Sequence, residues 1–221
     1  IASKQTLASP NKIIELADQG IAVTSENARN LIKYISDVEN INYDIIPEKK
    51  SVGRLGYIDG EGFSPYVDGL VFDGDTCYRD MFQAITSHGS GKEWTRIAAE
   101  CRSMSLTARI VLAASFASVL VQPVGCLPFF VHLWGGESGT GKTVGLMLAA
   151  SVWGNPVVGK YIKTFNATEV GHEKTAAFLN SLPMMIDELQ LARDARGKIQ
   201  FNVYALAQGV GRTRGTKSGG V

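Results

Sequence analysis

The chain has 221 residues, a formal net charge of +1, 45% hydrophobic and 19% charged side chains. This composition is that of a globular protein with a sizeable core, and it excludes a globally basic nucleic-acid-binding protein but not a local basic patch. Three cysteines without a CxxC pair argue against a disulfide framework or a zinc site. The longest apolar run, residues 110–121, is shorter than the roughly 20 residues of a membrane span. We therefore expect a buried helix there, no membrane partner and a cytoplasmic protein.

Residues 1–125 are predicted to form a helical and small β region that acts as a partner or DNA-interaction module. Helices are expected after Ser9-Pro10, ending at Gly20, and after Thr24 or Ser25. Residues 45–75 are rich in glycine, aspartate and aromatic residues, which predicts a small antiparallel β unit. Its expected turns are Asp59-Gly60 and Asp73-Gly74, and the residues expected on the buried face of the second helix are Leu31, Ile32, Ile35 and Val38.

Residues 126–221 are predicted to form an α/β core. The apolar run LPFFVHLWG is typical of a strand buried on both faces of a parallel sheet. A helix, a strand, a helix and a strand follow, and this alternation predicts parallel strands with right-handed crossovers and helices on both sides. The expected later elements are residues 144–154, 157–165, 167–181 and 183–188.

The stretch from Gly136 to Thr143 fits the pattern G-x-x-x-x-G-K-[ST] and follows the first predicted strand. Glycines at such positions allow the backbone N–H groups to point at a phosphate chain, and the next helix adds its positive N-terminal dipole. Lys142 can reach the β and γ phosphates of ATP, and the Thr143 hydroxyl can bind Mg²⁺. The predicted ATP-binding residues are Gly136, Glu137, Ser138, Gly139, Thr140, Gly141, Lys142, Thr143 and Val144.

Asp187 and Glu188 end the apolar run LPMMIDE, at the carboxyl edge of a buried strand. Open α/β sheets bind ligands at this edge. We expect Asp187 to hold Mg²⁺ through water and Glu188 to orient and deprotonate the attacking water. Two solvated residues at a strand end are the plain alternative. The acidic pair favours hydrolysis over phosphoryl transfer to a substrate hydroxyl, and we see no arginine-rich lid of the kind a kinase needs.

Two further sets of residues are weaker candidates. Asn166 follows the middle strand, where AAA+ proteins carry a polar residue that holds the catalytic glutamate off-line until a partner binds; Thr164 is the alternate, and a helix N-cap or turn role for Asn166 is equally open. Near the end of the chain, Arg212, Arg214 and Lys217 alternate with glycine and small polar residues. This segment is either a loop that binds a nucleic-acid backbone or a solvated turn, and less readily an arginine finger.

These motifs resemble those of the "domain of unknown function 927" family of phage, plasmid and prophage helicase–primase-like proteins, to which replicative helicases of staphylococcal cassette chromosomes are similar. The resemblance is carried by Leu55-Gly56-Tyr57, by Gly91-Lys92-Glu93-Trp94 (one residue shorter than the family pattern), and by HLWGGESGTGKT, AASVWGNP, TFNATEVG and MMIDEL. It implies an AAA+-like P-loop ATPase related to superfamily III helicases, with Lys142, Thr143, Asp187 and Glu188 in the roles given above.

The expected function is therefore a Mg²⁺-dependent ATPase that works as a helicase-like DNA motor in the replication of a mobile element. We expect single-stranded or forked DNA as a partner and a homo-oligomeric ring for the full-length protein. A nucleotide-gated switch or scaffold that recruits a primase or initiator is the alternative. Because few residues follow Asp187, we expect a C-terminally truncated core that hydrolyses ATP poorly by itself.

Overall fold

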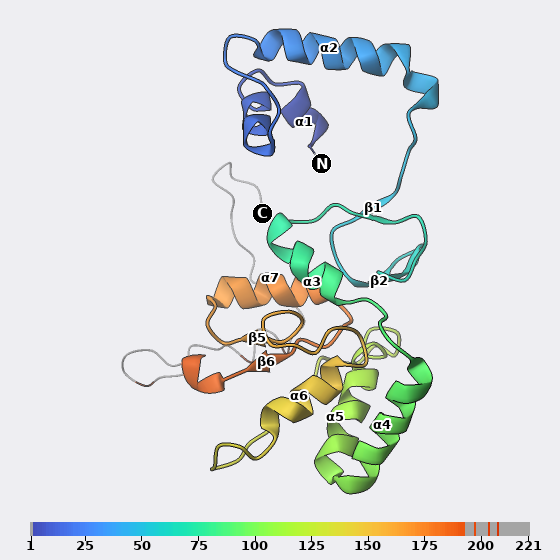
Figure 1. Cartoon of the computed structure of the whole chain (residues 1–221), viewed down its shortest axis with the longest axis vertical. Coiled ribbons are helices and arrows are strands. Elements are labelled where there is room, and N and C mark those ends of the chain that lie inside the picture. The colour runs from blue at the N-terminus through green and yellow to red at the C-terminus, as the bar shows by residue number, and fades with distance from the viewer. Residues whose placement is uncertain (1, 193–196, 198–202, 204–206, 208–221) are drawn as a thin grey trace. The chain divides into compact units, whose positions relative to one another are not determined.

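Short capped helices and very short strands make up the computed structural model of this chain (Figure 1). The structure describes residues 2–192, 197, 203 and 207. The chain divides into two units, Ile1–Lys50 and Ser51–Val221, which are described separately below. This division lies earlier than the predicted border at residue 125.

The N-terminal unit is a small helical cluster. Its core is formed by Ile13, Leu16, Val23 and Ala28, all buried. The first predicted helix is tighter and starts later than expected, since it is a 3-10 helix that begins at Ile13; the second is confirmed. Its elements are α1 (Lys4–Leu7), η1 (Ile13–Gln19), α2 (Ala28–Ile41) and η2 (Tyr43–Ile45).

Capping groups fix the helices of this unit. Gly20 has a φ of 85° and ends η1 in the left-handed conformation that suits glycine. Before α2, the Thr24 amide donates to Asn27 Oδ1 at 2.7 Å, while the Asn27 amide donates to Thr24 Oγ1 at 3.4 Å. These reciprocal bonds place the start of α2 at Ala28.

The second unit begins with four short strands. β2 and β3 form the predicted antiparallel hairpin around Asp59-Gly60, but β1 and β4 pair in parallel, so the expectation of a wholly antiparallel unit is wrong. The segment that ends with Asp73-Gly74 leads into a helix instead of reversing into a paired strand. The bounds are β1 (Ser51–Val52), β2 (Gly56–Ile58), β3 (Gly62–Ser64) and β4 (Val71–Phe72).

Three helices and one 3-10 turn follow, and α4 and α5 form a hairpin (Figure 1). Ser90 and Ser105 cap α4 and α5, each through its side-chain oxygen. The predicted apolar helix at residues 110–121 is present as α5, but only one face is buried, since Ile110 and Phe116 are each 48% exposed. The bounds are η3 (Thr76–Tyr78), α3 (Arg79–Ala84), α4 (Gly91–Met104) and α5 (Leu106–Ser118).

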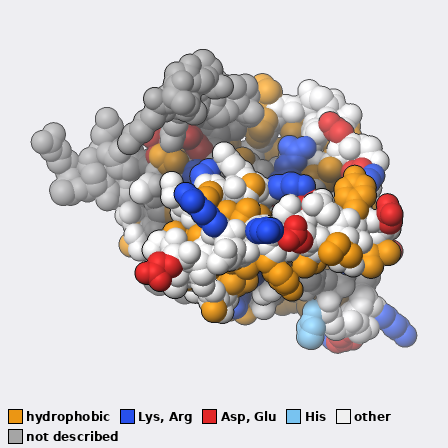
Figure 2. Space-filling view, turned by 90° about the horizontal axis from the view of Figure 1, so that it is seen from above, with side chains coloured by type: hydrophobic (Ala, Val, Ile, Leu, Met, Phe, Trp, Pro, Cys, Tyr) orange, Lys and Arg blue, Asp and Glu red, His pale blue; other side chains and the backbone are white. Residues whose placement is uncertain are grey.

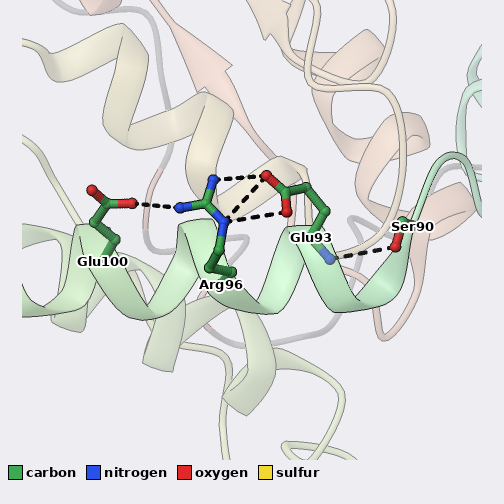
Figure 3. A network of polar contacts seen from close by, with 4 residues as sticks. All are labelled: Ser90, Glu93, Arg96 and Glu100. Atoms are coloured by element: carbon green, nitrogen blue, oxygen red, sulfur yellow. Dashed lines mark hydrogen bonds and ion pairs between the residues drawn. The ribbon is translucent and has the colours of Figure 1, made fainter.

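The solvent face of α4 carries a small ion-pair network (Figure 3). Arg96 contacts Glu93 at 2.7 Å and Glu100 at 3.1 Å. The Glu93 partner raises the pKa of the Arg96 guanidinium, and Arg96 lowers the pKa of the Glu93 carboxyl. All three side chains are more than half exposed, so solvent screens the pairs and their contribution to stability is small.

The remaining helices and strands carry the sequence motifs. α6, β5, α7 and β6 are a helix, a strand, a helix and a strand, in the predicted order. β5 and β6 are parallel, with Lys163 opposite Ile186 and Thr164 opposite Asp187. α5 packs against α6, and Figure 1 shows α4, α5 and α6 side by side. The bounds are α6 (Lys142–Ala150), β5 (Lys163–Thr164), α7 (Glu169–Leu179), β6 (Ile186–Asp187) and η4 (Leu189–Ala192).

The strand expected at residues 127–135 is not formed in the structure, so this prediction was wrong. Residues 126–135 form neither helix nor strand, and Leu127, Phe129 and Phe130 are 72%, 48% and 48% exposed. A strand requires a hydrogen-bonded neighbour, and within the described residues the sheet at β5 has only β6 as its second member. The three-layer parallel core therefore remains a prediction.

The main core of the second unit crosses residue 125. Leu55, Met81 and Val111 are buried in one cluster with Ala150 and Ile162. The β segment and α3–α5 thus share a core with the helix that follows the glycine-rich loop. The separation into residues 1–125 and 126–221 is not reflected in the packing.

The surface gives two further findings. None of the described helices is long and apolar enough to cross a membrane. Three large side chains of the N-terminal unit are exposed: Tyr34 by 66%, Ile41 by 82% and Tyr43 by 74%. In Figure 2, hydrophobic side chains lie among charged ones on the face seen from above.

Candidate nucleotide-binding site

The loop of residues 136–141 projects from the N-terminus of α6 and is exposed along its whole length. Gly139 and Gly141 have φ values of 77° and 84°, in the left-handed region that glycine adopts without strain. Gly141 is also the N-cap of α6, and no side chain among the described residues caps this helix. The first amide groups of α6 are therefore available to an anion, as the motif predicted.

The ammonium group of Lys142 folds back over the loop. Its Nζ donates to the Glu137 carbonyl at 2.7 Å and to Thr140 Oγ1 at 3.1 Å. Both acceptors are neutral, and a charged phosphate oxygen forms a stronger bond with an ammonium group than either does. Lys142 is thus held at the centre of the loop by contacts that a phosphate can replace. Thr140 contributes its side-chain hydroxyl to this contact.

A single hydrogen bond joins the loop to the acidic pair. Thr143 Oγ1 donates to Asp187 Oδ2 at 2.7 Å, and both residues are partly buried. They are 44 positions apart in the sequence, on α6 and at the end of β6. The predicted proximity of the two metal-binding residues is therefore present in the structure.

The oxygen atoms of Thr143 and Asp187 fit Mg²⁺ in their chemistry. Mg²⁺ prefers oxygen ligands, keeps several waters, and uses one or two protein carboxylates together with substrate phosphates. Among the described residues there is no cluster of three or more His, Cys, Asp or Glu side chains that would hold a metal by itself. Thr143 and Asp187 therefore supply too few ligands to hold Mg²⁺ by themselves. Phosphate and water oxygens would have to complete the coordination.

Glu188 lies immediately beyond β6 in an unusual backbone conformation. Its φ is 61°, in the left-handed region, and its amide donates to Asp187 Oδ1 at 2.8 Å. A non-glycine residue in this region costs on the order of 1 kcal/mol, and such residues cluster at functional sites. The Asp187 carboxylate thus has one oxygen on Thr143 and the other on the Glu188 backbone, while the Glu188 side chain is exposed.

Asn166 lies at the same edge as Glu188. The Phe165 amide donates to the Asp187 carbonyl at 3.2 Å, so Asn166 and Glu188 each follow the last bonded position of their strand. Thr164 lies in β5 and is paired with Asp187 of β6. The N-cap role left open for Asn166 is excluded, because Thr168 caps α7 by accepting from the Gly171 amide at 3.1 Å.

A hollow of about 380 Å³ opens beside this edge. The Asn166 side chain is exposed and has no hydrogen bond within the part of the chain that the structure describes. The hollow is lined by Phe165, Asn166, Ala167, Thr168, His172, Leu191 and Ala192. The predicted basic residues Arg212, Arg214 and Lys217 lie outside the described residues.

Sequence reasoning missed the contacts that hold the far end of α6. Trp94 Nε1 of α4 donates to Ser151 Oγ at 2.9 Å, and Trp153 Nε1 donates to Ser115 Oγ of α5 at 3.0 Å. The Ser115 hydroxyl in turn donates to the Ala149 carbonyl at 2.7 Å. Two tryptophans in separate motifs were the available signal, because a buried indole N–H needs an acceptor.

Sequence reasoning also missed how Leu55-Gly56-Tyr57 docks on the end of α7. The Leu55 amide donates to the Phe178 carbonyl at 2.8 Å. Asn180 Nδ2 donates to the carbonyls of Leu55 and Tyr57 at 3.1 and 3.0 Å. A Cβ on Gly56 would lie 2.7 Å from the Ser181 amide nitrogen, so this approach requires glycine. The β segment therefore supports the connection that leads into β6.

Comparison with known families gives one match. The family model described as "Domain of unknown function (DUF927)" matches residues 2–221. No curated protein matches the chain. The match confirms the family predicted from the sequence motifs, while the relationship to helicases stays a prediction.

Proposed function

We propose that this chain, which belongs to the DUF927 family, is an ATP-binding and ATP-hydrolysing domain of P-loop type. The observation that carries the proposal is the 2.7 Å bond between Thr143 and Asp187, which brings the glycine-rich loop and the acidic strand end together. A phosphate-binding loop without a nearby carboxylate can bind an anion. The combination also supplies the ligands and the base that hydrolysis requires.

In the proposed mechanism, the loop binds the phosphates. Amide groups at the start of α6 and the Lys142 ammonium, released from Glu137 and Thr140, contact the β and γ phosphate oxygens. Thr143 and Asp187 would hold Mg²⁺, which when bound neutralises charge that develops on the phosphate oxygens. The hydrogen bond between Thr143 and Asp187 keeps their side-chain oxygens next to each other.

Glu188 is the proposed base. Its exposed carboxylate follows β6 directly, and its left-handed backbone is fixed by the bond to Asp187 Oδ1. It would accept a proton from a water molecule that attacks the γ phosphate in line. Asn166, at the same edge, would hold Glu188 off-line until a partner binds, and this restraint makes turnover depend on the partner.

For the biological role, we propose a helicase-like DNA motor in the replication of a mobile element. The support is the family membership and the motif resemblance, which is analogy at the level of the fold. DNA would be the partner that releases the restraint on Glu188, the full-length protein would form a homo-oligomeric ring, and Arg212, Arg214 and Lys217 would contact the nucleic-acid backbone.

A fluorescent ATP analogue and a steady-state phosphate-release assay test the enzymatic part. Lys142→Ala should weaken nucleotide binding by at least a hundredfold, since it removes the only lysine of the loop. Glu188→Gln should bind normally but lose turnover by roughly a hundredfold. Glu26→Gln, at an exposed position of the N-terminal unit, is the control for Glu188→Gln and should leave both unchanged. Unaltered turnover in Glu188→Gln would refute the hydrolytic assignment.

A nucleotide-gated scaffold is the second candidate. The N-terminal unit has its own core and carries exposed Tyr34, Ile41 and Tyr43, which favours a module that contacts a protein partner. A motor should hydrolyse ATP several times faster with single-stranded DNA and should unwind a forked duplex. Equal rates with and without DNA, and no unwinding, would favour the scaffold.

A further inference from the structure

Tyr161 is the largest fully buried side chain in the described part of the chain, and the proposed mechanism does not use it. It lies in the connection between α6 and β5 and is 1% exposed. Its hydroxyl donates to the Pro183 carbonyl at 2.7 Å, on the segment that leads into β6. Burial raises the pKa of Tyr161 well above its ordinary value of 10.0, so the hydroxyl keeps its proton and donates at neutral pH.

Two backbone hydrogen bonds from the β5 side to the β6 side define the register of the two strands. The Lys163 amide donates to the Met185 carbonyl at 3.0 Å, and the Phe165 amide donates to the Asp187 carbonyl at 3.2 Å. The donors are two residues apart, and so are the acceptors, as in any parallel ladder. The last acceptor belongs to Asp187, the residue whose carboxylate contacts the glycine-rich loop helix.

The hydroxyl of Tyr161 continues this spacing toward the start of both strands. Because bonds of a parallel ladder recur every two residues, the rung before Lys163 would join position 161 to the carbonyl of position 183. The Tyr161 hydroxyl is the donor that this carbonyl receives. The side chain therefore holds Pro183 in the same register as the two backbone rungs that follow.

The register of β6 decides which side chain meets the helix that follows the loop. In the present register, Asp187 Oδ2 accepts from Thr143 Oγ1 at 2.7 Å. Successive residues of a strand face opposite sides, so a shift by one position would bring Ile186 or Glu188 to the place of Asp187. β5 and β6 are only two residues long, and few backbone bonds oppose such a shift.

We propose that Tyr161 is a positioning residue, which sets the register of β6 and so places the Asp187 carboxylate against Thr143. Tyr161 acts through the Pro183 carbonyl and touches no reacting atom. The inference rests on the proposed function, because it assigns Tyr161 to the placement of the two residues that would hold Mg²⁺. Three observations carry it: the burial of Tyr161, its bond to Pro183, and the two-residue spacing that this bond shares with the ladder.

Three variants separate positioning from stability. Tyr161→Phe removes the hydroxyl and keeps the ring in the core. Tyr66→Phe is the control for the chemical change, since the Tyr66 hydroxyl also donates to a backbone carbonyl, that of Trp153 at 3.1 Å. Ser115→Ala is the control for lost stability, since it removes buried hydrogen bonds at the far end of α6. All assays use the full chain well below the melting temperature of each variant, so that only folded protein is compared.

The first measurement is hydrogen exchange without nucleotide, read at the Lys163 and Phe165 amides. In Tyr161→Phe these amides should exchange about tenfold faster relative to the amides of α7, because their acceptors lie on a segment held by one bond fewer. The two control variants should leave this ratio unchanged. Wild-type exchange at both amides in Tyr161→Phe would overturn the inference, and this result does not depend on catalysis.

The second measurement is binding of a fluorescent ATP analogue as Mg²⁺ is titrated. Binding without Mg²⁺ depends on the loop and should be unchanged in Tyr161→Phe. The Mg²⁺ concentration for half-maximal strengthening of binding should rise about tenfold, because the carboxylate of Asp187 is less well placed. The two control variants should titrate like the wild type, and Asp187→Asn should lose the Mg²⁺ effect.

The possible outcomes distinguish the inference from the proposed function. If Tyr161 only stabilises the core, Tyr161→Phe should lower the melting temperature and keep the wild-type Mg²⁺ titration, and that result would overturn the inference. A wild-type titration in Asp187→Asn would instead refute the metal-binding part of the proposed function. The exchange measurement would then test by itself whether Tyr161 fixes the register.

Discussion

The two ends of α6 differ in how they are held. At the N-terminal end the loop of residues 136–141 is exposed, and among the described residues Lys142 is bound only by neutral groups of the loop itself. At the C-terminal end, Trp94 of α4 and Ser115 of α5 form hydrogen bonds within or directly beyond the helix. Tyr66 beyond β3 adds a bond to the Trp153 carbonyl at 3.1 Å.

This difference is what the proposed phosphate-binding role of α6 requires. The loop must leave its amide groups unpaired so that an anion can bind them, and therefore it contributes little to stability. A helix with a free N-terminus can still be held rigidly if its other end is packed and bonded. Changes at the anchored end should therefore reduce stability, and changes at the loop should reduce binding.

The largest expected effect on stability comes from Gly154→Ala at the anchored end. A Cβ at this position would lie 2.2 Å from the Ala84 carbonyl oxygen, which also accepts from the Asn155 amide at 2.7 Å. The backbone must move to relieve this clash, at a cost of about 3 kcal/mol. Thermal unfolding should shift downward by roughly 6–12 °C.

Gly136→Ala is the matched control at the loop end. A Cβ on Gly136 meets nothing within 4 Å, so the melting temperature should stay unchanged. Nucleotide affinity should fall roughly tenfold, because the methyl group obstructs the approach of phosphate to the backbone. Equal losses of stability in both variants would contradict the proposed difference between the two ends.

Ser115→Ala should have the next largest effect. Ser115 is 1% exposed, and its hydroxyl accepts from Trp153 Nε1 and donates to the Ala149 carbonyl. Its removal leaves an indole N–H without its acceptor and costs about 2 kcal/mol. Differential scanning calorimetry should show a lower melting temperature. Ser118→Ala, which removes only a bond to the Ser115 carbonyl within one helix, should change it far less.

The pH dependence of stability tests the burial of His172 in α7. Burial lowers the pKa of His172 below its ordinary value of 6.5, so the unfolded chain takes up this proton at a higher pH than the folded chain. The associated stability is complete above about pH 6.5 and is lost as the pH falls through the lower folded value. Melting temperatures between pH 8 and 5 should therefore fall more steeply for the wild type than for His172→Gln. Parallel curves would contradict this.

The smallest effect is expected from Arg96→Ala. Its ion pairs lie on α4, the helix whose Trp94 holds the anchored end, but they are exposed to solvent (Figure 3). Chemical denaturation should give the same midpoint as the wild type. A clear loss of stability would show that exposed contacts, and not only buried ones, anchor α6.

Much of the candidate site was predictable from the sequence. The positions of the glycines, Lys142 and Thr143 follow from what a phosphate requires of a short loop before a helix. Asp187 and Glu188 were predictable because an apolar run that ends in two carboxylates marks a strand edge. The bounds of α7 were close to the prediction, and Thr168, which caps this helix, marks its start.

Other features followed no local pattern. The apolar run at residues 127–135 has the composition of a buried strand, but it has no strand partner in the part of the chain that the structure describes, and Leu127 is exposed. Parallel pairing of β1 with β4 was missed because both antiparallel and parallel strands fit such short apolar runs. The burial of His172 against the ring of Phe165 was also missed, since a single histidine in a helix is not distinctive.

The sequence by itself determined the local chemistry: where the chain turns, where α6 begins, and which side chains can contact phosphate, metal and water. These properties depend on backbone dihedrals and on residues a few positions apart. Only the tertiary structure decided that Trp94 contacts Ser151, that Leu55-Gly56-Tyr57 supports the end of α7, and that His172 packs against the ring of Phe165. Such contacts join distant segments, and they form because buried polar groups must find partners, wherever in the chain those partners lie.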